Sequence, residues 1–114
     1  MKFQKADVTT SQDLSAGTLS YTTSSSNRKW KLDSVVIHFS QTITETVTIT
    51  RDSKHGANYD HILAKRSLVA EQDFRFTPSG EENFQDGDEL KVQCTNANLT
   101  GVAYVIIKRT ELPW

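Results

Sequence analysis

Cysteine is almost missing from this chain of 114 residues, because Cys94 is the only one. A single cysteine cannot form an intramolecular disulfide or supply the ligand pairs of a zinc ribbon, which excludes a secreted disulfide scaffold. Cys94 lies in an alternating apolar segment, where a lone cysteine is usually a small core residue. A catalytic thiol would need an exposed setting and a neighbouring base, and the sequence indicates neither.

The chain also lacks long hydrophobic runs and an excess of charge of one sign. No apolar run approaches the roughly 18 residues that indicate a membrane span, and residues 1–14 lack the hydrophobic region of a signal peptide. A net charge of −1 argues against a nucleic-acid binder, which usually carries a clustered basic face. We therefore expect a protein made in the cytoplasm, with no membrane and no nucleic acid as partner.

Helical periodicity is nearly absent, and strand signals recur in its place. About seven to nine short strands without a substantial helix predict an all-β fold, an antiparallel β-sandwich that is jelly-roll-like. The expected strands cover residues 17–23, 29–39, 42–50, 62–64, 67–70, 73–77, 89–94 and 101–109.

One sandwich domain is expected over residues 15–111, a size that suits a single core. Residues 1–14 are polar around an isolated Phe3 and are predicted to form an N-terminal arm. Residues 112–114 are predicted to form a C-terminal tail, which ends in Trp114.

Two of the expected strands are apolar on both faces. In residues 29–39, strict alternation places Trp30 and Leu32 on the face opposite Val35, which predicts burial on both sides. In residues 101–109, Tyr104 and Ile106 lie opposite a second apolar face. The latter strand is therefore expected to be central in its sheet or to meet a partner with its second face.

The densest polar chemistry lies in residues 51–66, RDSKHGANYDHILAKR. A metal site could recruit Asp52, His55, Asp60 and His61, but their spacing lacks the ligand pairs of structural zinc sites. The interpretation we favour is a turn stabilised by hydrogen bonds from its Asp and Ser residues, with His55 exposed at its tip.

A second acidic stretch, QDGDE, resembles a fragment of a calcium loop. Asp86, Asp88 and Glu89 would be its ligands, but the full loop needs oxygen ligands over twelve positions. We expect instead a hairpin turn with Gly87 in the left-handed conformation. The sequence predicts no catalytic residue, no metal ligand and no cofactor, and hence no enzyme.

Residues 45–111 resemble a pattern found in small structural proteins of tailed bacteriophages and prophages. The features that carry the resemblance are Asp52-Ser53, Gly56, Tyr59-Asp60, Ile62-Leu63, residues 68–70, an aromatic strand before Pro78, residues 87–90, and residues 96–101 before a hydrophobic strand.

The resemblance implies a non-enzymatic part of the virion, such as a capsid decoration protein. Such proteins assemble as symmetric oligomers, here a homodimer or homotrimer, and contact the major capsid protein or other virion proteins. The residues expected to meet partners are Phe3, His55, Tyr104, Ile106 and Trp114.

A carbohydrate- or receptor-binding module is the alternative function. Lectin-like sandwiches bind sugars on exposed aromatic rings, and aromatic side chains are amphipathic enough to serve there. Trp30 and Tyr59 are the candidates for that role.

Overall fold

The computed structural model describes residues 4–16, 18–24, 29–80, 82–85, 87–95 and 101–111. Within these ranges the chain is all β apart from two short 3₁₀ turns, η1 (Leu14–Ala16) and η2 (Ala57–Tyr59). The strands are β1 (Gln4–Asp13), β2 (Leu19–Ser24), β3 (Trp30–Ile43), β4 (Thr46–Asp52), β5 (His61–Ser67), β6 (Glu71–Phe76), β7 (Glu82–Phe84), β8 (Glu89–Cys94) and β9 (Val102–Glu111).

The strands form one long antiparallel ribbon that is folded over itself. β1 pairs with β9, β2 with β8, β3 with β6 and β4 with β5. The chain therefore runs out along four strands, turns between β4 and β5, and returns. Pairing of β3 with β9 and of β4 with β8 joins adjacent turns of the ribbon.

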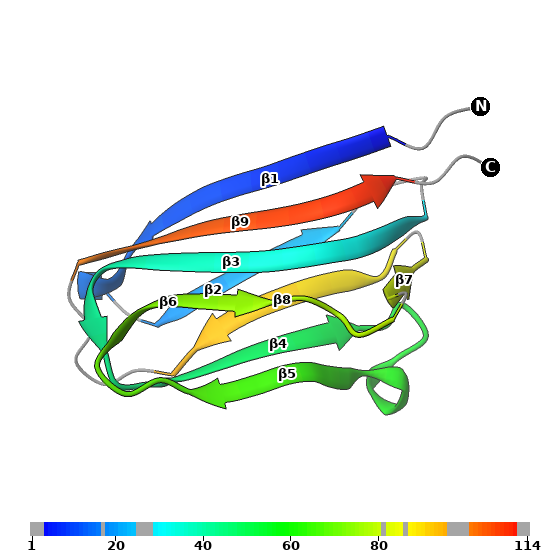
Figure 1. Ribbon diagram of the computed structural model, residues 1–114. Helices are drawn as coiled ribbons and strands as arrows, with labels where there is room; N and C mark the ends of the chain where they lie inside the picture. The colour runs from blue at the N-terminus through cyan, green and yellow to red at the C-terminus, as the bar shows by residue number, and fades with distance from the viewer. Residues whose placement is uncertain are drawn as a thin grey trace.

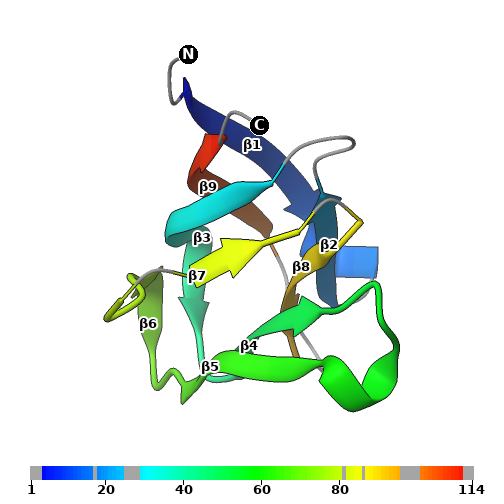
Figure 2. The ribbon, with the colours of Figure 1, turned by 90° about the vertical axis from the view of Figure 1, so that its right-hand side faces the viewer.

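Folding the ribbon in this way produces two sheets that pack face to face (Figures 1 and 2). The first sheet has the order β1-β9-β3-β6, with β7 also paired to β3, and the second has the order β2-β8-β4-β5. With β7 as a short addition, this is the arrangement of a jelly roll. The predicted fold class is confirmed.

β1 is a full edge strand of the first sheet (Figure 1). Its ten residues pair with β9 in an unbroken register, from Gln4 opposite Glu111 to Asp13 opposite Val102. The expected N-terminal arm is therefore wrong for residues 4–13. The sequence pattern did not predict this strand, because Val8 is its only large apolar residue and the alternation of apolar and polar residues is therefore weak.

A β-bulge in β3 changes which side chains face the core. The pairing of β3 with β9 shifts between Leu32 and Ser34, so Asp33 is the extra residue. The extra residue shifts the alternation by one position, so Trp30 and Leu32 face the same way as the apolar residues that follow from Val35. The prediction that these two groups of side chains face opposite ways is wrong. Both sets are buried in the core: Trp30, Leu32, Val35, Ile37 and Phe39.

Trp30 lies at one end of this core and is fully buried. Its ring stacks on Phe84 of β7, with centroids 4.1 Å apart and planes 14° apart. The guanidinium carbon of Arg109 lies 5.3 Å from the Trp30 ring centre. The expectation that Trp30 binds sugar at the surface is therefore wrong, because its ring is part of the core.

Candidate functional site

The polar segment 51–66 forms the tip of the ribbon, where β4 turns into β5. The backbone N–H of Ser53 donates to Asp60 Oδ1 at 2.7 Å, and the N–H of His55 donates to Ser53 Oγ at 3.0 Å. Gly56 adopts a φ of +113° within this turn, a region that glycine enters without steric cost. The predicted turn stabilised by Asp and Ser is confirmed, and His55 is exposed in it.

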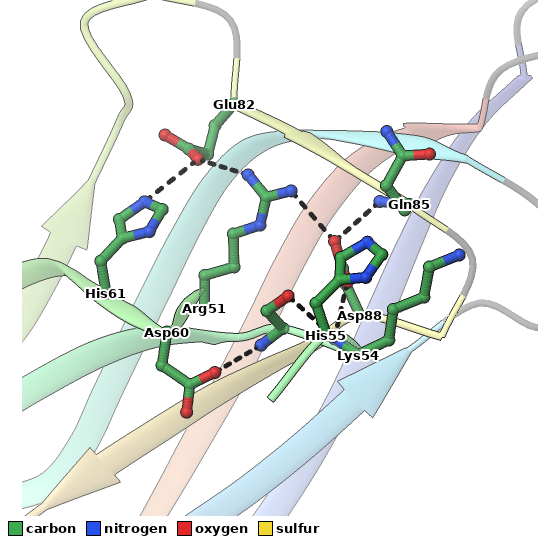
Figure 3. Close-up of polar contacts among 9 residues, drawn as sticks. Arg51, Lys54, His55, Asp60, His61, Glu82, Gln85 and Asp88 are labelled. Carbon is green, nitrogen blue, oxygen red and sulfur yellow. Dashed lines mark hydrogen bonds and ion pairs between the residues drawn. The ribbon is translucent and has the colours of Figure 1, made fainter. Parts of the chain in front are cut away.

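A buried carboxylate holds this tip to the turn before β8 (Figure 3). Asp88 is only 1% exposed. Its Oδ2 accepts hydrogen bonds from Arg51 Nη2 and from the N–H of Gln85, each at 3.0 Å. Its Oδ1 accepts the N–H of Lys54 at 2.9 Å. We call this set of four residues the Arg51–Asp88 clasp.

The second terminal nitrogen of Arg51 is engaged as well, whereas its buried Nε has no hydrogen-bond partner in the described part of the chain. Arg51 Nη1 donates to Glu82 Oε2 at 3.3 Å, and the guanidinium carbon lies 5.0 Å from the centre of the Phe84 ring. His61 Nε2 approaches the same Glu82 oxygen at 3.7 Å. Arg51 and His61 therefore connect β4 and β5 with Glu82 of β7, which belongs to the other sheet.

The electrostatics of Asp88 are those of a structural carboxylate. Burial acts to raise its pKa, but the N–H groups of Lys54 and Gln85 and the charge of Arg51 outweigh burial. The pKa of Asp88 consequently lies below its ordinary value of 3.8, because these donors favour the charged form. Both carboxylate oxygens accept hydrogen bonds within the protein, so the cluster acts as a fastener between sheets.

The acidic residues do not gather into a metal site in the described part of the chain. There, no group of three or more His, Cys, Asp or Glu side chains is placed to hold a metal ion. Gly87 has the predicted positive φ, at +90°, but the turn is not the predicted hairpin, because β7 and β8 belong to different sheets. Asp88, considered above as a calcium ligand, faces Arg51 instead.

A different arrangement occupies the outer face of the first sheet. Ile106 of β9 lies directly opposite Val36 of β3, and Tyr104 lies opposite His38. The His38 and Tyr104 rings have centroids 6.3 Å apart. Tyr104 is 47% exposed. We call the side chains of these four residues the outer patch.

Polar groups border the outer patch on both sides. On the β6 side, His38 Nδ1 lies 2.7 Å from Asp73 Oδ1. On the β1 side, a shallow hollow is lined by Thr9, Thr10, Ser11, Tyr104, Val105 and Ile106. The patch thus lies between a polar edge strand and the hydrogen-bonded contact of His38 with Asp73.

The structure brings together only some of the residues that sequence reasoning had assigned to partners. Tyr104 and Ile106 share the outer patch. His55 is at the ribbon tip, where its ring meets that of Tyr59 edge-on at 5.8 Å, and Tyr59 is 65% exposed. Phe3 and Trp114 lie outside the described residues, as does the expected C-terminal tail.

Sequence reasoning did not identify the contact between Arg51 and Asp88. No sequence signal connected Arg51 with Asp88, which are 37 positions apart. The one local hint was the Gly87 turn, which places Asp88 immediately before the start of β8 at Glu89.

Comparison with known proteins gives no assignment: no family model matches the chain, and no curated protein matches it in sequence. No helix in the described ranges is long and apolar enough to cross a membrane.

Proposed function

We propose that the chain is a non-enzymatic structural protein of a phage or prophage particle, which decorates or stabilises the capsid through protein–protein contacts. The observation that carries the proposal is the outer patch. Tyr104 and Ile106 extend from the central strand of a sheet, beside Val36, where a domain acting alone has no need of apolar side chains.

The fold and the polar cluster are both in accord with this role. Jelly rolls recur in viral capsid proteins and in lectins, an argument by fold analogy. The densest polar cluster of the described chain consists of groups that bind one another in the Arg51–Asp88 clasp. An apolar strip with an aromatic residue is the usual composition of the buried centre of a protein interface.

The test is co-sedimentation with empty capsids of the phage that encodes the chain. The intact protein should sediment with capsids, and Tyr104→Asp should abolish this by placing a charge in the contact. Thr22→Asp is the matched control, because Thr22 is exposed on β2 of the second sheet. Equal binding by the intact protein and both variants, or no binding by the intact protein, contradicts the proposal.

A carbohydrate- or receptor-binding role is the second candidate, and it now depends on Tyr59. The Tyr59 ring is 65% exposed at the ribbon tip, next to His55. Binding on a glycan array that is lost in Tyr59→Ala would favour this role over the first. A blank array would eliminate it.

A further inference from the structure

The free edge of β1 differs from the other edges of the sandwich. A sheet edge exposes unpaired N–H and C=O groups that can pair with another strand, and proteins protect such edges with charges, bulges or short strands. β6 carries Glu71, Asp73 and Arg75 in six residues. β5 carries Lys65 and Arg66 and is bulged against β4. β2 is only six residues long.

β1 is neither short nor bulged, and its charged residues, Lys5, Asp7 and Asp13, leave an uncharged segment in its second half. It is ten residues long, and its register with β9 has no shift. Between Asp7 and Asp13 it contains only Val8, Thr9, Thr10, Ser11 and Gln12. A long, regular edge with an uncharged segment of this kind is a template for pairing with a further strand.

We propose that β1 pairs antiparallel with β1 of a second copy of this chain, with Thr9 opposite Thr9 of that copy at a two-fold axis. In this register Lys5 of each copy lies opposite Asp13 of the other. Both side chains are exposed and on the same face of the strand. The edge is therefore complementary to itself, as a two-fold interface requires.

Charge and the length of the overlap together select this register among those that keep the two cores on the same side of the joined sheet. Moving the axis to Ala6 places Lys5 opposite Asp7, but the two copies of β1 then overlap only from residue 4 to residue 8. Moving the axis to Asp7 places two Asp7 side chains opposite each other, and like charges in that position are destabilising. Moving the axis to Val8 places Lys5 opposite Ser11 and leaves both charges unpaired. Only the axis at Thr9 combines two Lys5–Asp13 pairs with an overlap that runs from residue 5 to residue 13.

Both charges are available for the pairing. The Lys5 side chain is 80% exposed, and its contact with Asp33, at 3.7 Å, is a surface ion pair of small value. Asp13 accepts the Ser15 N–H at 2.9 Å. That hydrogen bond holds the pKa of Asp13 below its ordinary value of 3.8, and an aspartate is charged at neutral pH.

The dimer would contain one continuous sheet with the order β6-β3-β9-β1-β1-β9-β3-β6. The two outer patches would lie on the same face of that sheet, one on each side of the axis. This interface is separate from the proposed capsid contact, so it is tested in solution without capsids.

A cysteine pair tests the register directly. Residues directly opposite in an antiparallel pair have Cα atoms about 4.5–5.5 Å apart, which a disulfide can span. The Thr9→Cys variant should therefore form a covalent dimer under mild oxidation. In Ser11→Cys the two thiols would be four positions out of register, about 13 Å apart, so this control should stay monomeric on a non-reducing gel. The native Cys94 is buried in the unmodified fold.

Sizing with light scattering gives the oligomeric state of the unmodified chain. The series should extend to hundreds of micromolar, because small interfaces are generally weak. We expect a concentration-dependent dimer. A monomer throughout the series overturns the proposal, and so does a dimer in which the Ser11→Cys variant cross-links as fast as the Thr9→Cys variant.

Charge reversal separates pairing from folding. Lys5→Asp should weaken the dimer about tenfold, because two attractive pairs become repulsive. The swap Lys5→Asp with Asp13→Lys should restore it to within about threefold of the unmodified chain. Lys65→Asp, on the edge of β5, is the control and should have no effect. Failure of the swap to restore the dimer overturns the register.

Discussion

Arg51 Nη2 lies 3.0 Å from Asp88 Oδ2, and this ion pair fastens the tip of the folded ribbon to the turn before β8. Asp88→Asn should lower the free energy of unfolding by about 3 kcal/mol, because the amide removes a buried charge beside Arg51 and cannot accept all the hydrogen bonds that the carboxylate accepts. Urea denaturation measures the loss. The control is Asp73→Asn. Asp73 contacts His38 but its side chain is 74% exposed, so this variant should change stability by less than about 1 kcal/mol. Equal losses would show that the clasp contributes nothing special.

The pH dependence of stability follows from the same carboxylate. The pKa of Asp88 in the folded protein is lower than its ordinary value of 3.8. Its stabilising contribution is therefore fully present above about pH 4 and is lost as the pH falls through the folded-state pKa. Asp88→Asn should flatten the acid limb of a plot of melting temperature against pH. An unchanged acid limb would assign acid unfolding to other groups.

The buried ring of Trp30 gives a stability prediction that a sugar-binding role would not. Trp30→Ala should destabilise the fold by about 4 kcal/mol, as is typical when a buried aromatic residue is truncated. Tyr59→Ala removes an exposed ring and should change stability by less than about 0.5 kcal/mol. Thermal unfolding of the two variants checks both values. A mild effect of Trp30→Ala would contradict its place in the core.

Cys94 should be chemically inert while the protein is folded. Burial, with a contribution from the charge of Glu45, raises the pKa of its thiol to about 11, from an ordinary value of 9.0. Because the thiolate is the reactive form, labelling by an aromatic disulfide at pH 8 should be about a hundredfold slower in buffer than in denaturant. Rapid labelling of the folded chain would indicate that the thiol is accessible.

Gly101 marks a close approach of backbone to a side chain. Its φ is +89°, and a Cβ at this position would collide with Ser40 Oγ, which accepts the Val102 N–H at 2.8 Å. Gly101→Ala should therefore cost about 2 kcal/mol of stability. Gly80→Ala is the matched control, because a Cβ there would meet nothing within 4 Å. Comparable melting temperatures for the two variants would contradict this account.

Strands in which apolar and polar residues alternate strongly were predictable from sequence. The strand predictions that failed did so for physical reasons. β8 was predicted with the bounds it has in the structure, residues 89–94, because apolar and polar residues alternate throughout. The segment 42–50 alternates equally well, yet it divides between β3 and β4 as the chain passes from one sheet to the other. The alternation of apolar and polar residues indicates which side of a strand is buried, but it does not indicate that the chain passes from one sheet to another.

Long-range contacts set the other limits. β7 is three residues long, too short for a pattern, and is held by pairing with β3. The bulge at Asp33 depends on the register with β9, which lies far along the chain. The Arg51–Asp88 clasp likewise joins residues whose proximity exists only after the ribbon has folded.

The position of β9 between β1 and β3 also determines the order in which the protein can be completed. Every other described strand precedes β9 in the chain, and Gln4 finds its partner at Glu111. During synthesis, β1 therefore waits for the ribosome to release nearly all of the described residues before it can join a sheet. Contacts so distant in sequence slow folding, and an unpaired β1 is exposed to other nascent chains during that interval.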